Sequence, residues 1–243
     1  MELIHTSPYF NISNFSSSKR PGIFNALESR KAKVAIIGLD EEGIIELAKF
    51  SDHFATIGFD NRREIVNRLN HQMASVSNSL ENQETSFTSD SERLKEARFF
   101  VISIKSPLNE YYKPNLKSLT CAVRRVAKAL KKRDHVIFKY TSFPGCIEEI
   151  CLPILEMESK LRLNRDFTIG FCHQIESNEN LANEAENILM SASNPELIED
   201  YSEIFKRVEG RYIRPLANIR LAEIMSIISQ KEDSQDSTSL KYA

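Results

Sequence analysis

The stretch Lys33–Gly43, KVAIIGLDEEG, decides the fold. Its first five residues are mostly apolar and predict a buried strand, and Gly38 marks a turn into a helix that begins with acidic residues. A strand, a glycine turn and a helix in this order are typical of the βαβ unit that opens a dinucleotide-binding sheet. The fingerprint of that unit is G-x-G-x-x-G, and Gly38 and Gly43 fill its first and third glycine positions.

Asp40 stands where the second glycine of the fingerprint belongs. That position needs no side chain, because the pyrophosphate of a dinucleotide approaches the backbone there. A carboxylate adds both bulk and negative charge, and Glu41 and Glu42 add two further charges in the first turn. We therefore expect NAD to bind weakly or not at all. The alternative interpretation of the three acids is that they only cap the helix, whose N-terminus favours negative charge.

Composition places the chain among ordinary soluble proteins. It has 243 residues, 41% hydrophobic and 27% charged, and a formal net charge of −2. Nothing in this charge indicates a nucleic-acid partner or an anionic membrane surface, and no apolar run is long enough to span a membrane. The four cysteines lack paired metal spacing, and the N-terminus lacks the pattern of a secretory signal. We expect no metal site, free thiols and a cytoplasmic protein.

Strand-like and helix-like stretches alternate along the chain and predict a doubly wound, mainly parallel α/β sheet. We divide the chain into an N-terminal arm with a short helix (residues 1–30), a Rossmann-like domain (residues 31–214) and a long helix with a polar tail (residues 215–243). Residues 74–91 are predicted to be a loop, and the last helix is predicted to fray after Gln230. The expected strands are Val34–Ile37, Ala55–Phe59, Phe99–Ile104, Val136–Tyr140, Phe167–Phe171 and a short one at Ile188–Ser191.

Six blocks together resemble the NAD-binding half of the UDP-glucose/GDP-mannose dehydrogenase family. They are KVAIIGLDEEG, IGFDNRR, SDSERLKEARFFVISIKSP, YKPNLKSL, TSFPGCIEEICLPILE and LNRDFTIGF, and they occur in the order that the family has. The branch that oxidises UDP-N-acetylhexosamines is the most similar. The resemblance implies an N-terminal dinucleotide domain followed by a central helix that the family uses for dimerisation. The family's cysteine nucleophile lies in the C-terminal half, and none of the four cysteines here matches it.

The resemblance also assigns residues near the cofactor. Asp60 ends the second strand and matches the acid that holds the adenosine ribose. We include Arg62 beside it as an expected cofactor-binding residue. Ser106 stands where the family has Thr or Ser after its third strand, and Thr141 matches the Thr before a Pro-Gly turn. The alternative for Asp60 is that it only caps the following helix. With Gly38, Asp40 and Gly43, these residues form the expected cofactor site.

Three further positions depart from the family's catalytic pattern. Gln174 replaces a Glu that assists the chemistry, and it cannot act as a base. The resemblance also implies that Ser226 and Gln230 replace a catalytic Lys and Asn on the central helix. Ser226 cannot supply a cation to an oxyanion.

The sequence is compatible with three functions. The first is a catalytically degenerate homologue that acts as a scaffold or interaction module, in the setting of surface-polysaccharide synthesis. The second is the NAD-binding part of an active UDP-sugar 6-dehydrogenase. The third is a module that binds another nucleotide or anion in the cofactor cleft. The expected partner is a second copy or a full-length dehydrogenase relative, bound through the apolar terminal helix.

Overall fold

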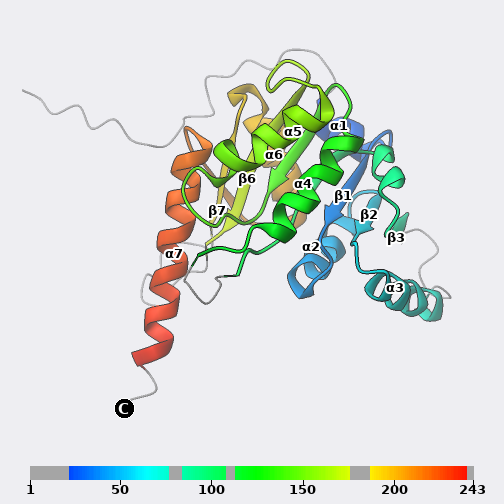
Figure 1. Cartoon of the computed structure of the whole chain (residues 1–243), viewed down its shortest axis with the longest axis horizontal. Helices are drawn as coiled ribbons and strands as arrows, with labels where there is room; N and C mark the ends of the chain where they lie inside the picture. The colour runs from blue at the N-terminus through cyan, green and yellow to red at the C-terminus, as the bar shows by residue number, and fades with distance from the viewer. Residues whose placement is uncertain (1–21, 77–83, 108–112, 176–186, 240–243) are drawn as a thin grey trace, which may run out of the picture.

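The computed structural model describes residues 22–76, 84–107, 113–175 and 187–239. Its centre is an eight-stranded sheet in the order β3-β2-β1-β4-β5-β6-β7-β8 (Figure 1). The strands are β1 (Lys33–Ile37), β2 (Thr56–Phe59), β3 (Thr85–Thr88), β4 (Ala97–Ile102), β5 (Asp134–Phe138), β6 (Phe167–Gln174), β7 (Asn187–Ala192) and β8 (Tyr212–Pro215). Neighbours from β3 through to β6 are parallel, β7 is antiparallel to β6, and β8 is parallel to β7. The predicted doubly wound, mainly parallel α/β fold is confirmed.

Helices cover both faces of this sheet. The α-helices are α1 (Ile23–Glu28), α2 (Glu41–Ser51), α3 (Arg63–Val76), α4 (Lys117–Ala129), α5 (Leu152–Ser159), α6 (Ile198–Glu209) and α7 (Ile219–Ser239). The short 3-10 helices are η3 (Ser91–Glu96) and η5 (Pro195–Leu197), and η4 (Ile147–Cys151) is a π-helical turn that leads into α5. Residues of α4, α5 and α7 pack on one face, and residues of α1, α2 and α6 pack on the other. None of the helices in these described ranges combines the length and apolar character needed to cross a bilayer.

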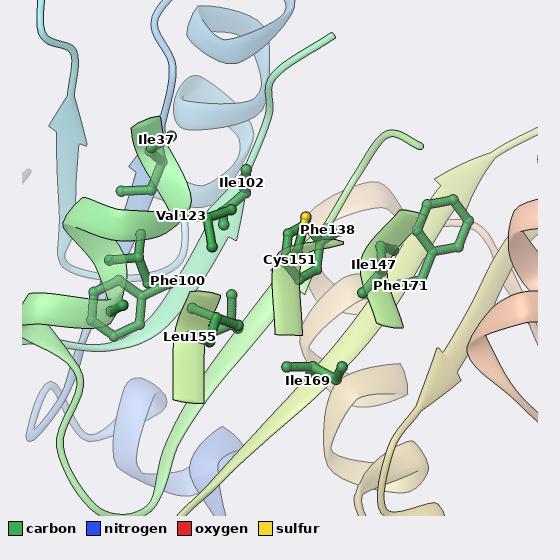
Figure 2. Packing of buried hydrophobic residues seen from close by; sticks show 14 of the residues in the cluster. Ile37, Phe100, Ile102, Val123, Phe138, Ile147, Cys151, Leu155, Ile169 and Phe171 are labelled. Atoms are coloured by element: carbon green, nitrogen blue, oxygen red, sulfur yellow. The ribbon is translucent and has the colours of Figure 1, made fainter. Parts of the chain in front are cut away.

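The strands are apolar on both sides because both faces are covered. Figure 2 shows one of the two cores, where Val123 of α4 and Leu155 of α5 lie over Phe100, Phe138 and other strand residues. A parallel sheet buried in this way requires nearly continuous hydrophobic strands instead of alternating ones. This is the pattern that makes β1, β4 and β5 recognisable in the sequence.

Several boundaries differ from the sequence predictions. The expected loop at residues 74–91 contains the end of α3 and the strand β3, whose backbone pairs with β2. The strand β8 was not predicted. The last helix begins at Ile219 and continues to Ser239, well beyond the predicted fraying point. Residues 1–21 of the predicted arm and 240–243 of the predicted tail lie outside the described residues.

A buried cluster of charges joins helix α2, helix α6 and the residue that follows strand β5. The Lys139 ammonium lies 3.0 Å from a Glu46 oxygen and 3.3 Å from a Glu209 oxygen, and Lys49 pairs with the other Glu209 oxygen at 2.6 Å. The Lys139 side chain is only 7% exposed. Burial alone would lower the pKa of Lys139, but the neighbouring Cys172 thiol group and the two carboxylates raise it. Lys139 therefore stays charged and holds the carboxylates of two helices beside the end of β5.

Replacing Lys139 by Met is expected to lower the free energy of unfolding by about 3–5 kcal/mol, because two buried carboxylates lose their shared cation. The measurement is urea unfolding at neutral pH. The matched control is Lys33→Met, which removes the half-exposed Lys33–Glu96 pair and should cost about 0–1 kcal/mol. Equal losses for the two variants would contradict a structural role for the buried cluster.

Candidate functional site

Two glycines shape the turn between β1 and α2. Gly38 has a φ of +96°, and a Cβ there would lie 2.7 Å from the Ser103 carbonyl oxygen. A Cβ on Gly43 would overlap the carbonyl oxygen of Gly38. Both positions therefore exclude side chains for reasons internal to the fold, as the first and third glycines of the fingerprint do.

The N-terminus of α2 is occupied by the chain's own carboxylates. Asp40 is the N-cap residue, and its Oδ1 accepts a hydrogen bond from the Gly43 N–H at 3.0 Å. Glu42 accepts a hydrogen bond from the Lys105 ammonium at 2.6 Å. This hydrogen bond and one from the backbone N–H of Glu42 itself hold the pKa of Glu42 below its usual range. The end of the helix where a pyrophosphate would bind thus already carries negative charge.

Asp60 lies at the end of β2 and is buried. Its Oδ1 accepts from the backbone N–H and the Nε–H of Arg62, both at 2.9 Å. Its Oδ2 accepts from the Leu39 N–H at 2.9 Å and from Nη2 of Arg62 at 2.7 Å. Burial would raise the pKa of this carboxyl, but the hydrogen bonds from Arg62 and Leu39 lower it. Asp60 is therefore an ionised group that ties the β1 turn to the start of the next helix.

A cleft of about 520 Å³ opens at this edge of the sheet. It lies at the carboxyl end of β1, whose neighbours in the sheet are β2 on one side and β4 on the other. Ligands usually bind at this position in an open α/β sheet. Its lining comes from the turns after β1, β2 and β4 and from the first turns of α4. The lining residues are Ile37, Gly38, Asp40, Phe59, Asp60, Asn61, Arg62, Ile104, Lys105, Lys117, Ser118, Cys121 and Ala122.

Two of the cations that line this cleft are paired with carboxylates. Arg62 is held by Asp60 and Lys105 by Glu42, and these hydrogen bonds raise the pKa of both cations. The Asp40 carboxylate adds a smaller electrostatic contribution to both pKa values. Asp40 is thus the negative group shared by the two cations of the cleft.

The structure brings together five of the predicted site residues. Gly38, Asp40, Asp60 and Arg62 line the cleft, and Gly43 lies directly behind Asp40. Ser106 and Thr141 are not among the lining residues. The Ser106 hydroxyl is buried and makes no hydrogen bond to any described residue. Thr141 donates its hydroxyl to Glu223 at 2.7 Å.

The residues at the predicted catalytic positions lie elsewhere. Gln174 ends β6 and is partly exposed. Ser226 is fully buried on α7, and its hydroxyl donates to the Glu223 carbonyl at 3.0 Å. Gln230 also belongs to α7, but its side chain lies outside the described residues. The two described side chains carry no charge.

Sequence reasoning missed Glu223, which anchors the loop after β5 to α7. Its carboxylate accepts from Thr141, from the Gly145 N–H at 2.6 Å and from the Ile147 N–H at 3.1 Å. Burial raises the pKa of this carboxyl more than those hydrogen bonds lower it. An acid inside the apolar run LAEIMSII was the signal that pointed to a specific partner.

Lys105 and Lys117 were also missed as cleft residues. Lys105 directly follows the predicted strand Phe99–Ile104, so it was expected at the carboxyl edge of the sheet, and this was a usable signal. Lys117 begins α4, and its place in the cleft depends on how two distant segments pack.

A Rossmann-like sheet with a cleft at its switch point defines the class of dinucleotide-binding domains. The sequence profile of the UDP-glucose/GDP-mannose dehydrogenase family, NAD binding domain, matches residues 32–209. The chain belongs to this family.

Curated relatives agree with this assignment, and a solved structure shows the same fold. A UDP-N-acetyl-D-glucosamine 6-dehydrogenase from Salmonella typhi is 29% identical over 209 residues, which are 83% of this chain and 49% of the relative. The corresponding protein from Pseudomonas aeruginosa is 28% identical, over 82% of this chain and 49% of its own. A ternary complex of GDP-mannose dehydrogenase from Pseudomonas aeruginosa superposes with a TM-score of 0.72 at 15% identity, covering 84% of this chain and 50% of that one. This chain spans about half the length of the curated relatives it matches.

The Asp60–Arg62 pair should make stability pH-dependent in a defined direction. Because the folded pKa of Asp60 is lowered from 3.8, its contribution is present above the unfolded pKa and is lost as the pH falls through the folded pKa. The difference in unfolding free energy between the native protein and Asp60→Asn should therefore narrow as the pH falls below about 5.

The control for this measurement is the same comparison in an Arg62→Met background. There burial acts on Asp60 without the guanidinium, so the folded pKa is lowered less or not at all and the narrowing below about pH 5 should shrink or disappear. Urea unfolding at a series of pH values gives both curves. A difference between native and Asp60→Asn that stays constant down to pH values well below 3.8 would contradict the assignment.

Proposed function

We propose that this chain is a catalytically degenerate member of the family that serves as a scaffold or interaction module. The observation that carries the proposal is the carboxylate-filled N-terminus of α2. Asp40 accepts the Gly43 N–H, and Glu42 is fixed at the same helix end by Lys105. An NAD pyrophosphate would have to displace or approach these charges.

The size of this obstacle follows from simple electrostatics. Two like charges about 4 Å apart repel by about 4 kcal/mol at an effective dielectric of 20. Since about 1.4 kcal/mol is a factor of ten in affinity, Asp40 alone can cost about a thousandfold. The backbone N–H that Asp40 occupies adds to this cost, because it is no longer free to donate to a phosphate.

The positions on β6 and α7 support the same proposal. The resemblance places a catalytic Glu at Gln174 and a catalytic Lys at Ser226. Gln174 is neutral, and Ser226 is a buried hydroxyl satisfied by the helix itself. A dehydrogenase would need both a proton acceptor and a cation near the reacting carbon.

The alternative function is the NAD-binding part of an active UDP-sugar 6-dehydrogenase. The retention of Gly38, Gly43 and Asp60 favours it, as do the activities named for the relatives. NADH formation by the purified protein with UDP-N-acetylglucosamine would establish this alternative over the degenerate one.

Calorimetry with NAD and NADH tests the central proposal. The native protein should show no binding in the micromolar range, and Asp40→Gly should tighten binding by about a hundredfold or more, because it removes the charge and frees the Gly43 N–H. The control is Glu41→Gln, which removes a first-turn acid that does not line the cleft. Low-micromolar binding by the native protein would refute the proposal.

We further propose that α7 provides the interaction surface. Leu221, Ile224, Met225 and Ile228 follow the i, i+3, i+4, i+7 spacing of a helix-pairing stripe. Leu221 and Met225 are partly buried against the core, while Ile224 and Ile228 are 37% and 52% exposed. The helix lies at one side of the molecule and extends past the sheet (Figure 1). A second copy of the chain, paired through the same stripe, is the occupant that matches this arrangement.

Light scattering at micromolar concentrations is expected to give a dimer for the native protein and a monomer for Ile228→Glu, because a buried carboxylate would oppose apolar pairing. Ile45→Glu is the matched control, since Ile45 is 51% exposed on α2, away from the stripe. A native monomer would exclude self-pairing and leave a full-length dehydrogenase relative as the partner to test.

A further inference from the structure

The Asp60 carboxylate has no acceptor capacity left for a ligand. An ionised carboxylate offers about four lone-pair sites. Leu39 N–H, Arg62 N–H, Arg62 Nε–H and Arg62 Nη2–H supply four donors to its two oxygens. In a dinucleotide site the acid at this position accepts hydrogen bonds from ribose hydroxyls. Here a free ribose diol would find the acceptor already saturated.

Arg62 replaces that acceptor with donors. A guanidinium carries five N–H groups, of which two are committed to the Asp60 side chain, so three remain. The Arg62 side chain is 51% exposed and lines the cleft. An arginine beside the ribose position is the feature that accommodates a phosphate on the ribose in place of a hydroxyl.

A second cation lines the same cleft. Lys117 begins α4 and lines the cleft beside Ser118. Within the described part of the chain its ammonium forms no ion pair, whereas Lys105 is paired with Glu42. The cleft therefore holds two cations with unused donors, Arg62 and Lys117, together with the Asp40 carboxylate.

We propose that this cleft binds a nucleoside that carries a phosphate monoester on its ribose 2′- or 3′-oxygen, with that phosphate between Arg62 and Lys117. The cleft volume of about 520 Å³ suits a ligand of this size. A phosphate on the 5′-oxygen would face Asp40 and is disfavoured. The inference rests on the proposed function at one point, which is the exclusion of a 5′-pyrophosphate from the Asp40 part of the cleft.

Calorimetry with adenosine 2′-monophosphate, adenosine 3′-monophosphate, adenosine 5′-monophosphate and adenosine tests the inference. The native protein should bind adenosine 2′- or 3′-monophosphate at least about tenfold more tightly than adenosine 5′-monophosphate or adenosine. The reason is that only a 2′- or 3′-phosphate can form charge-assisted hydrogen bonds with Arg62 and Lys117. Binding of the 5′-phosphate equal to that of the 2′- and 3′-phosphates would overturn the proposal. So would a failure of every one of these ligands to bind.

Substitution of Arg62 gives a reversal that a purely structural role would not produce. Arg62→Ala removes the phosphate donors and frees two sites on the Asp60 carboxylate, so the preference for the 2′- or 3′-phosphate should disappear while unmodified adenosine binds better than to the native protein. Arg63→Ala is the matched control, because Arg63 is exposed and does not line the cleft. Lys117→Met leaves the Asp60–Arg62 pair intact and should weaken phosphate binding by about tenfold.

The outcomes separate this inference from the proposed function. Low-micromolar NAD binding together with a retained 2′- or 3′-phosphate preference would refute only the proposed function. Absence of binding by both NAD and the adenosine phosphates would refute only the inference. An unchanged ligand preference in Arg62→Ala would also overturn the inference, whatever the NAD result.

Discussion

The contact between Gly43 and the carbonyl of Gly38 is the constraint on which the rest of the structure depends. It lets α2 start directly above the end of β1, and this sets the helix on its face and opens the cleft beside β4. Any side chain at Gly43 would push the helix away from the sheet. The third glycine of the fingerprint is therefore needed by the fold even when no ligand is bound, whereas the second is needed only by a ligand. Asp40 at that second position caps the helix and leaves the fold intact.

The charges around the cleft are paired within the chain itself. Asp40 acts on Arg62 and Lys105, Glu42 holds Lys105, and Asp60 holds Arg62. The Asp60 contacts use acceptor sites that the ribose of a dinucleotide would otherwise require. The Lys105–Glu42 and Leu39–Asp60 hydrogen bonds join separate turns of the sheet and so fix those turns relative to one another. The same contacts thus stabilise the edge of the sheet and change what the cleft can recognise.

The sequence predicted the parts of the fold that depend on local pattern. β1, β4 and β5 are continuous apolar runs because both sheet faces are covered, so they were predicted to within a few residues. β3 reads TSFT and lies at an edge, and β8 contains Pro215, so neither has the apolar pattern of a central strand. In the site, Asp40 and Asp60 were found because the fingerprint fixes their spacing. The saturation of Asp60 and the position of Lys117 depend on side-chain contacts between elements, which spacing does not encode.

The terminal helix shows the same contrast as the glycine turn: a residue that the fold needs is kept, and a residue that a ligand would need is replaced. Glu223 contacts the chain's own backbone, where it accepts the N–H groups of Gly145 and Ile147 and so holds the loop after β5 against α7. One turn further on, where the resemblance implies a lysine that would act on substrate, the Ser226 hydroxyl donates to the Glu223 carbonyl of its own helix. At both places the group that supports the fold is present and the group that would serve a ligand is replaced. These two replacements, in elements that are far apart in the sequence, are the observations on which the proposed scaffold role rests. Glu223 ties α7 to the loop after β5, so the position of the proposed interaction surface on α7 depends on the same contacts that hold this loop.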